Sequence, residues 1–174
     1  VIYKASDDST VETIAVTSGQ VTGTGTAQIT INPSSDFDSS TEYYVQIAAT
    51  GFDDSSGNSY AGITDKTSLS FTSTDTTAPS LSSSSPADNA TAVAVGGNIV
   101  LNFSEAVDVE SGNIVIYKAS DDSTVETIAV TSSQVTGTGT TQITINPSSD
   151  FDSSTEYYVQ IAATGFDDSS GNSY

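Results

Sequence analysis

The sequence predicts an all-β protein, built from antiparallel β-sandwiches that repeat with an offset of 114 residues. Residues 1–60 recur almost unchanged at residues 115–174, so the chain contains an internal repeat. Several short stretches alternate apolar and polar side chains, as half-buried strands do, and none has the spacing of an amphipathic helix. Turn residues separate these stretches, and short strands at such intervals are typical of a sandwich.

The two copies are close enough to indicate the same structural task in both. They differ at two positions only, Gly19 against Ser133 and Ala27 against Thr141. Residues 61–114 occur once. We therefore expect the chain to be a window on a longer tandem array, about one and a half repeats wide.

The boundary between repeats is expected within the stretch TSTDTTAPS, residues 72–80. Pro79 restricts the residue before it and cannot continue a central strand. This places the C-terminal part of one repeat at residues 1–74, without its opening strands. The next repeat then covers residues 75–174, without a last strand.

Period-two alternation identifies the strands of the second repeat and the closing strand of the first. In chain order, the predicted strands are residues 67–71 (TSLSF), 98–103 (NIVLNF), 113–117 (NIVIY), 125–130 (VETIAV), 141–145 (TQITI) and 155–161 (TEYYVQI).

Two pairs of tyrosines stand near the start of a late strand in each copy. Tyr157 and its counterpart Tyr43 follow a tight turn, which is the sequence context of a tyrosine corner, a structural hydrogen bond. Tyr158 and Tyr44 are expected to point the other way and to be available for surface contacts.

The charge balance excludes some partners. The chain has 22 acidic residues against three lysines and no arginine, a formal net charge of -19. Nucleic acids and anionic membranes are bound through Lys and Arg, so we expect neither as a partner. The acids either solvate the surface or bind a cation, and composition alone leaves both readings open. No stretch is long and apolar enough for a membrane span, so no membrane insertion is expected.

Catalysis is not expected. A serine nucleophile needs an activating base, and the chain has no histidine or cysteine. The carboxylates lie mostly in short turns, so they are better explained as solvated loops than as a catalytic pair.

Several motifs resemble the bacterial Ig-like repeats of giant cell-surface adhesins, most closely those of a swimming-motility surface protein. The resemblance covers essentially the whole chain and rests on PADNAT, FSEAV, TEYYV and the D-x-x-GN-x-Y loop, here Asp168 to Tyr174. It implies tandem Ig-like Greek-key sandwiches, an extracellular location at the cell surface, and a role as extender or adhesin module, commonly stiffened by calcium.

Topology would gather acidic loops at the pole where the second repeat begins. Calcium takes six to eight oxygen ligands, and a cluster of acids would repel itself without a cation. The expected ligands there are Asp75, Glu105 (in a loop after the second strand), Asp167, Asp168 and Asn172, with Asp36 and Asp38 of the preceding repeat. The alternative is that these are ordinary turn residues. The family resemblance favours calcium.

The sequence thus favours a structural extender whose partners are neighbouring identical repeats, in the same or an adjacent chain. Within this chain the first repeat has no counterpart of Glu105 or Asp75, so its site is expected to be empty or incomplete unless a neighbouring chain completes it. The alternative function is a repeated adhesion module that binds glycans or cells through exposed aromatic residues. Its candidates are Tyr44, Tyr60 and Tyr158.

Overall fold

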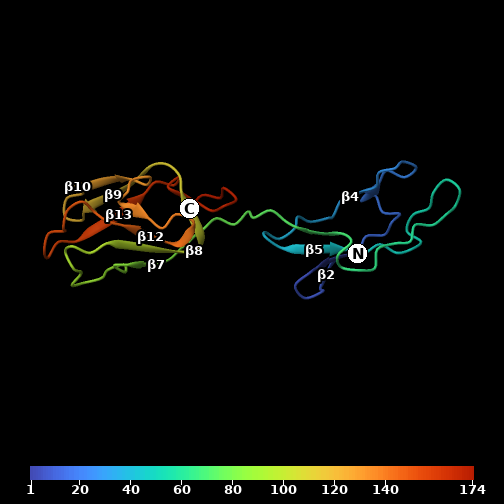
Figure 1. Cartoon of the computed structure of the whole chain (residues 1–174), viewed down its shortest axis with the longest axis horizontal. Coiled ribbons are helices and arrows are strands. Elements are labelled where there is room, and N and C mark those ends of the chain that lie inside the picture. The colour runs from blue at the N-terminus through green and yellow to red at the C-terminus, as the bar shows by residue number, and fades with distance from the viewer. The chain divides into compact units, whose positions relative to one another are not determined.

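The computed structural model describes residues 1–174 and is all-β. It divides into two compact units, Val1–Asp75 and Thr76–Tyr174 (Figure 1). No helix in the structure has the length and apolarity needed to cross a membrane.

The second unit is an antiparallel β-sandwich of two sheets. Its strands are β7 (Leu81–Ser85), β8 (Ile99–Val109), β9 (Asn113–Lys118), β10 (Thr124–Ala129), β11 (Val135–Thr136), β12 (Thr140–Ile145), β13 (Tyr157–Ile161) and β14 (Phe166–Asp167). One sheet has the order β11-β12-β8-β14, with β7 also paired to β8, and the other has the order β10-β9-β13. The chain changes sheet repeatedly, and β13 returns to lie beside β9 (Figure 1). This is the Greek-key connectivity expected of an Ig-like sandwich.

The core of the second unit lies between its two sheets. Alternate residues of β8 and β9 point inward, because successive side chains of a strand face opposite sides. The fully or nearly fully buried apolar residues are Ile99, Leu101, Phe103, Val107, Ile114, Ile116, Ile128, Val130, Val135, Ile143, Ile145 and Phe166. They come from both sheets, so the expected sandwich is confirmed.

The first unit contains a four-stranded sheet and a separate strand pair. Its strands are β1 (Ile2–Lys4), β2 (Thr10–Glu12), β3 (Val21–Thr22), β4 (Thr30–Ile31), β5 (Glu42–Val45) and β6 (Ser70–Thr72). The sheet has the order β2-β1-β5-β6, and β3 pairs with β4. Its buried apolar core is small: Ile2, Tyr43 and Val45, with Ile14, Phe37, Ile47 and Phe71 packed against them.

Nearly identical sequences form strands of different length in the two units. The pair β3–β4 has two residues in each strand, whereas β12, the counterpart of β4, runs for six residues beside β8. A strand extends where a neighbour satisfies its backbone groups. The first unit has no strand in the place of β8. Its strand β4 therefore contains only Thr30 and Ile31, the two residues that pair with β3.

The predicted tyrosine corner is present in both copies. The backbone N–H of Asp152 donates to the Tyr157 hydroxyl at 2.8 Å, and that of Asp38 donates to the Tyr43 hydroxyl at 2.9 Å. Each bond joins the start of a strand to the turn five residues upstream, which fixes where the chain enters the sheet.

We expect Tyr157→Phe to lower the free energy of unfolding of the second unit by about 1 kcal/mol, because the Asp152 N–H loses its acceptor. Urea denaturation measures this loss. Tyr158→Phe is the matched control, since the Tyr158 hydroxyl bonds only the exposed Asp122 carboxylate, at 3.2 Å. Equal losses in the two variants would contradict the structural role of Tyr157.

Candidate metal centre

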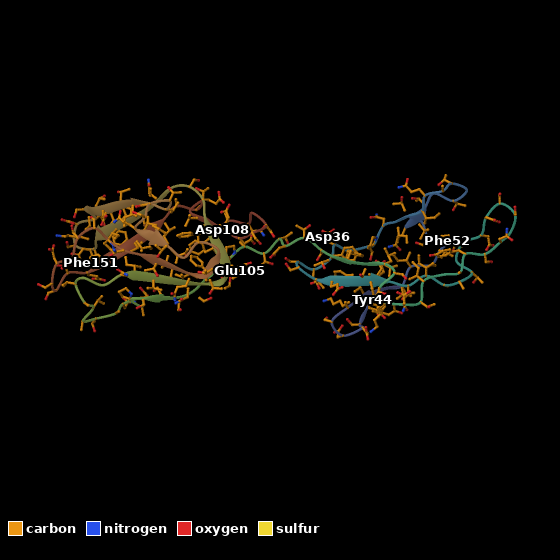
Figure 2. The ribbon with its side chains drawn as sticks, in the orientation of Figure 1. Asp36, Tyr44, Phe52, Glu105, Asp108 and Phe151 are labelled. Atoms are coloured by element: carbon orange, nitrogen blue, oxygen red, sulfur yellow. The ribbon has the colours of Figure 1, made fainter.

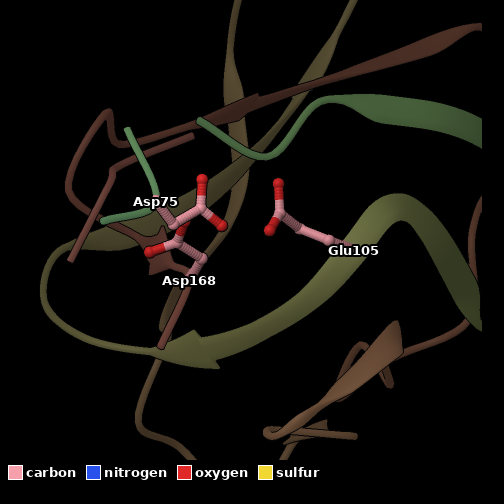
Figure 3. Close-up of side chains that lie close together, drawn as sticks. All are labelled: Asp75, Glu105 and Asp168. Atoms are coloured by element: carbon pink, nitrogen blue, oxygen red, sulfur yellow. The ribbon is translucent and has the colours of Figure 1, made fainter. Parts of the chain in front are cut away.

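Three carboxylates lie together at Asp75, Glu105 and Asp168, with one oxygen of each within 4.8 Å of the others. Figure 3 shows the three side chains pointing toward one another. Asp75 is the boundary residue directly before Thr76, Glu105 belongs to β8, and Asp168 follows β14. Residues about 90 positions apart in sequence thus meet at one place.

Glu105 owes its position to an irregularity in β8. Gln142 pairs with Asn102, but Thr140 pairs with Val107, so β8 uses more residues than β12 between these two pairs. Such a bulge bends a strand and redirects its side chains. The prediction that Glu105 lies in a loop after the strand is wrong, because β8 continues through it to Val109.

Asp168 is held by its own loop and is only 5 % exposed. Its Oδ1 accepts hydrogen bonds from the backbone N–H groups of Ser170 and Asn172, both at 2.8 Å. The Nδ2 of Asn172 donates to Asp168 Oδ2 at 2.8 Å. Asn172, predicted as a ligand, therefore supports the carboxylate with its side-chain nitrogen.

Asp167 lies next to this cluster in sequence, in the last strand. Its backbone pairs with that of Asp108 in β8, so two acidic residues stand directly opposite each other, an unfavourable arrangement. The Oδ1 of Asp167 is buried without a hydrogen-bond partner. Such an atom carries a desolvation cost unless a water or a cation satisfies it.

Asp36 and Asp38 lie between β4 and β5 of the first unit and are exposed (Figure 2 labels Asp36). Neither belongs to the three-carboxylate cluster. Asp38 pairs with Lys4 at 2.5 Å, and this contact raises the pKa of Lys4. No local pattern in the sequence indicates this pair, because Lys4 and Asp38 belong to different segments of the first unit.

The matching loop of the first unit shows what the cluster adds. Asp54 accepts hydrogen bonds from the backbone of Ser56 and Asn58 and from the Asn58 side chain, all at 2.8 Å, which are the contacts of Asp168. The bonds from Asn58 lower the pKa of Asp54. Asp54 is nevertheless exposed, because no counterpart of β8 covers it. The loop geometry is therefore local, and the convergence of Glu105 and Asp75 on it is the specific feature.

The aromatic residues considered for surface recognition are mostly engaged. Tyr44 is 3 % exposed and its ring stacks on Tyr3 with centroids 5.0 Å apart, so the expectation of a surface-available side chain is wrong there. Tyr158 stacks on Tyr117 in the same way, at 4.9 Å, and is half-buried. Tyr60 is 43 % exposed.

The chain consists of two β-rich units built from one repeated sequence, and the second of them is an antiparallel β-sandwich. It is therefore a β-rich repeat protein. The chain belongs to the bacterial Ig-like domain family, whose sequence model matches residues 2–73 and 75–174. Neither the comparison with curated proteins nor that with solved structures found a match. Domains of this family are generally structural modules without catalytic activity, and they are typically extracellular or at the cell surface.

Proposed function

We propose that this chain is an extender of a large bacterial surface adhesin or filament, in which calcium stiffens the boundary between successive repeats. The observation that carries the proposal is the convergence of Asp75, Glu105 and Asp168. Near-identical copies, each contacting mainly its neighbours, would add length in proportion to their number.

The donor set fits calcium. All three side chains offer carboxylate oxygens, the hard ligands that calcium prefers, at 2.3–2.6 Å from the ion. Ligands on opposite sides of such an ion are about 4.6–5.2 Å apart by that geometry, and the three oxygens lie within 4.8 Å of one another. Backbone carbonyls or water would complete the six to eight ligands. A cation would also offset the repulsion among the three acids.

The position of Asp75 gives the ion a mechanical role. Asp75 is the residue at which the first compact unit ends, and a single peptide bond joins it to the second unit. An ion held by Asp75, Glu105 and Asp168 would fix this boundary residue to β8 and to the loop after β14. Rotation at the boundary would then be restricted, and a flexible chain of repeats would become stiffer.

We expect calorimetric titration of the 174-residue chain with calcium to show one bound ion, with a Kd of about 10⁻⁴–10⁻³ M, as in other extracellular modules. A single site is expected because the loop of Asp54 has no counterpart of Glu105. No binding at millimolar calcium would contradict the metal centre. Magnesium is the control cation, since it demands a smaller and more regular site.

The stiffening is read in the same titration with a pair of spin labels. The chain contains no cysteine, so Ser35→Cys and Ser149→Cys, at exposed and equivalent positions of the two copies, label each unit once. We expect calcium to narrow the distribution of label–label distances. Ion binding without narrowing would keep the metal centre but refute the stiffening.

A second candidate function is a repeated glycan- or cell-binding module. It is favoured by one observation, the exposed ring of Tyr60 beside the apolar side chains of Ile47 and Phe52. Binding of the chain to a glycan array, lost in Tyr60→Ala, would support adhesion by the repeat itself. An array without binding would leave the extender as the better account.

A further inference from the structure

The carboxylate of the boundary residue Asp75 is held by a turn of the first unit. The Oγ of Ser39 donates a hydrogen bond to Asp75 Oδ1 at 2.7 Å. Ser39 lies in the turn of residues 38–41, directly before β5, whereas Asp75 lies just beyond the end of β6. Both residues belong to the first unit. The first unit itself therefore orients one of the three carboxylates of the cluster.

The segment that leads to Asp75 is tied to the same turn by its backbone. The N–H of Ser73 donates to the carbonyl of Thr41, and the N–H of Thr41 donates to Ser73 Oγ, both at 3.0 Å. The N–H of Ser40 donates to the carbonyl of Thr74 at 3.3 Å. These bonds continue the pairing of β5 with β6 beyond the end of β6. Asp75 is therefore placed by the sheet of the first unit and not by a flexible linker.

The turn has the same shape in the second copy of the sequence. Ser40 and its counterpart Ser154 both adopt a positive φ, 48° and 54°. A tyrosine corner holds both turns. The chain has no counterpart of Asp75 beside the second turn, where Ser153 is exposed, whereas the equivalent Ser39 is half-buried. The turn thus forms without Asp75, and a preformed turn is suited to orient a side chain that docks on it.

Hydrogen bonds from surrounding groups orient the carboxylates that ligate metal ions, and losing such a partner typically weakens metal binding by about 10–100-fold. Ser39 has the geometry of such a partner. It donates to one oxygen of Asp75, and a carboxylate with one accepted hydrogen bond keeps lone pairs on both oxygens for an ion. Figure 3 shows the Asp75 carboxylate turned toward those of Glu105 and Asp168.

We propose that Ser39 is a positioning residue of the metal centre, through which the first unit orients a ligand of the ion. The proposal rests on the proposed function, because it takes calcium as the ion of the cluster. The calcium affinity then depends on the folded state of the preceding repeat, and by linkage calcium stabilises that repeat. Calcium thus couples the stabilities of consecutive repeats, in addition to stiffening their boundary.

Calorimetric titration of the 174-residue chain with calcium tests the role of the hydroxyl. Ser39→Ala is expected to raise the Kd about tenfold, the lower end for such partners, since Ser39 is only half-buried. Ser153→Ala removes the same hydroxyl from the same turn of the second copy, and should leave the Kd unchanged. Ser39→Thr keeps a hydroxyl at the position and should restore most of the affinity.

Hydrogen exchange of β6 tests the coupling, because this strand occurs once in the chain and reports on the first unit. In the original chain, saturating calcium should raise the protection of β6 about tenfold, since linkage makes the two effects reciprocal. Ser39→Ala should lose most of this rise, while β5 and β6 stay protected in chelator. A hydroxyl with a purely structural role would instead lower the protection equally with calcium and with chelator.

The proposal is overturned if Ser39→Ala binds calcium as tightly as the original chain, or if Ser153→Ala weakens binding as much as Ser39→Ala does. It is equally overturned if calcium leaves the protection of β6 unchanged. An original chain that binds no calcium refutes the proposed function and this proposal with it, whereas calcium binding that is indifferent to Ser39→Ala refutes this proposal alone. A loss specific to Ser39→Ala and recovered in Ser39→Thr supports it.

Discussion

Phe166→Ala is expected to destabilise the second unit by about 3–5 kcal/mol, the cost of removing a buried phenylalanine from a packed core. Phe166 is completely buried, and its ring contacts Phe103 across the sheet. Phe52→Ala makes the same substitution in the other copy. There we expect a loss of about 1 kcal/mol, since Phe52 is half-buried at an open groove and leaves no closed cavity.

Hydrogen exchange can measure both effects in the intact chain. Strand β8 reports on the second unit and strand β6 on the first. Both lie in the part of the sequence that has no second copy in the chain, so their fragments can be assigned to one unit. Phe166→Ala should lower the protection of β8 by about two to four orders of magnitude. β6 should be unaffected by it. Similar losses for Phe52→Ala and Phe166→Ala would mean that the groove of the first unit is filled in solution.

Much of the second sandwich could be predicted from its sequence, because its strands alternate clearly. NIVLNF places Ile99, Leu101 and Phe103 on one face, and all three are buried. The strand β7 was missed, since LSSSS carries one apolar residue and reads as linker. It forms a strand because the edge of β8 offers backbone partners, a tertiary effect that no local pattern encodes.

The candidate site could be predicted in part. Sandwich topology sufficed to expect Asp75, Glu105 and Asp168 at one pole. The placement of Glu105 within β8 depends on a bulge, and the sequence FSEAV gives no sign of one. The support that Asn172 gives to Asp168 has a signal in the sequence, the repeated D-x-x-G-N pattern, because Asx turns hold an aspartate with nearby backbone N–H groups. The ion pair of Asp38 with Lys4 could not be predicted, because the two residues lie far apart in sequence and next to each other in space.

The second large effect is expected from Glu105→Gln, which keeps the size of the side chain and removes one carboxylate from the cluster. In the original chain, calcium at about 30 times its Kd should stabilise the folded state by ~2 kcal/mol. For a domain of about 100 residues this corresponds to roughly 10 °C in Tm. Glu105→Gln should abolish most of this calcium-dependent increment, because a neutral amide is a weaker calcium ligand than a carboxylate.

Calorimetric melting with calcium and with chelator measures this calcium-dependent increment in Tm. A direct effect of the substitution on folding appears in both conditions and therefore cancels in the difference. Two controls change charge in the same way elsewhere. Glu110→Gln alters an exposed acid just beyond β8, and Asp54→Asn alters the matching loop of the first unit, which has no counterpart of Glu105. Both should keep the full increment. If all three variants lose the increment alike, calcium acts by general screening of an acidic surface. If Glu105→Gln alone loses the increment, the ion binds at the cluster, and the boundary residue Asp75 is held with it.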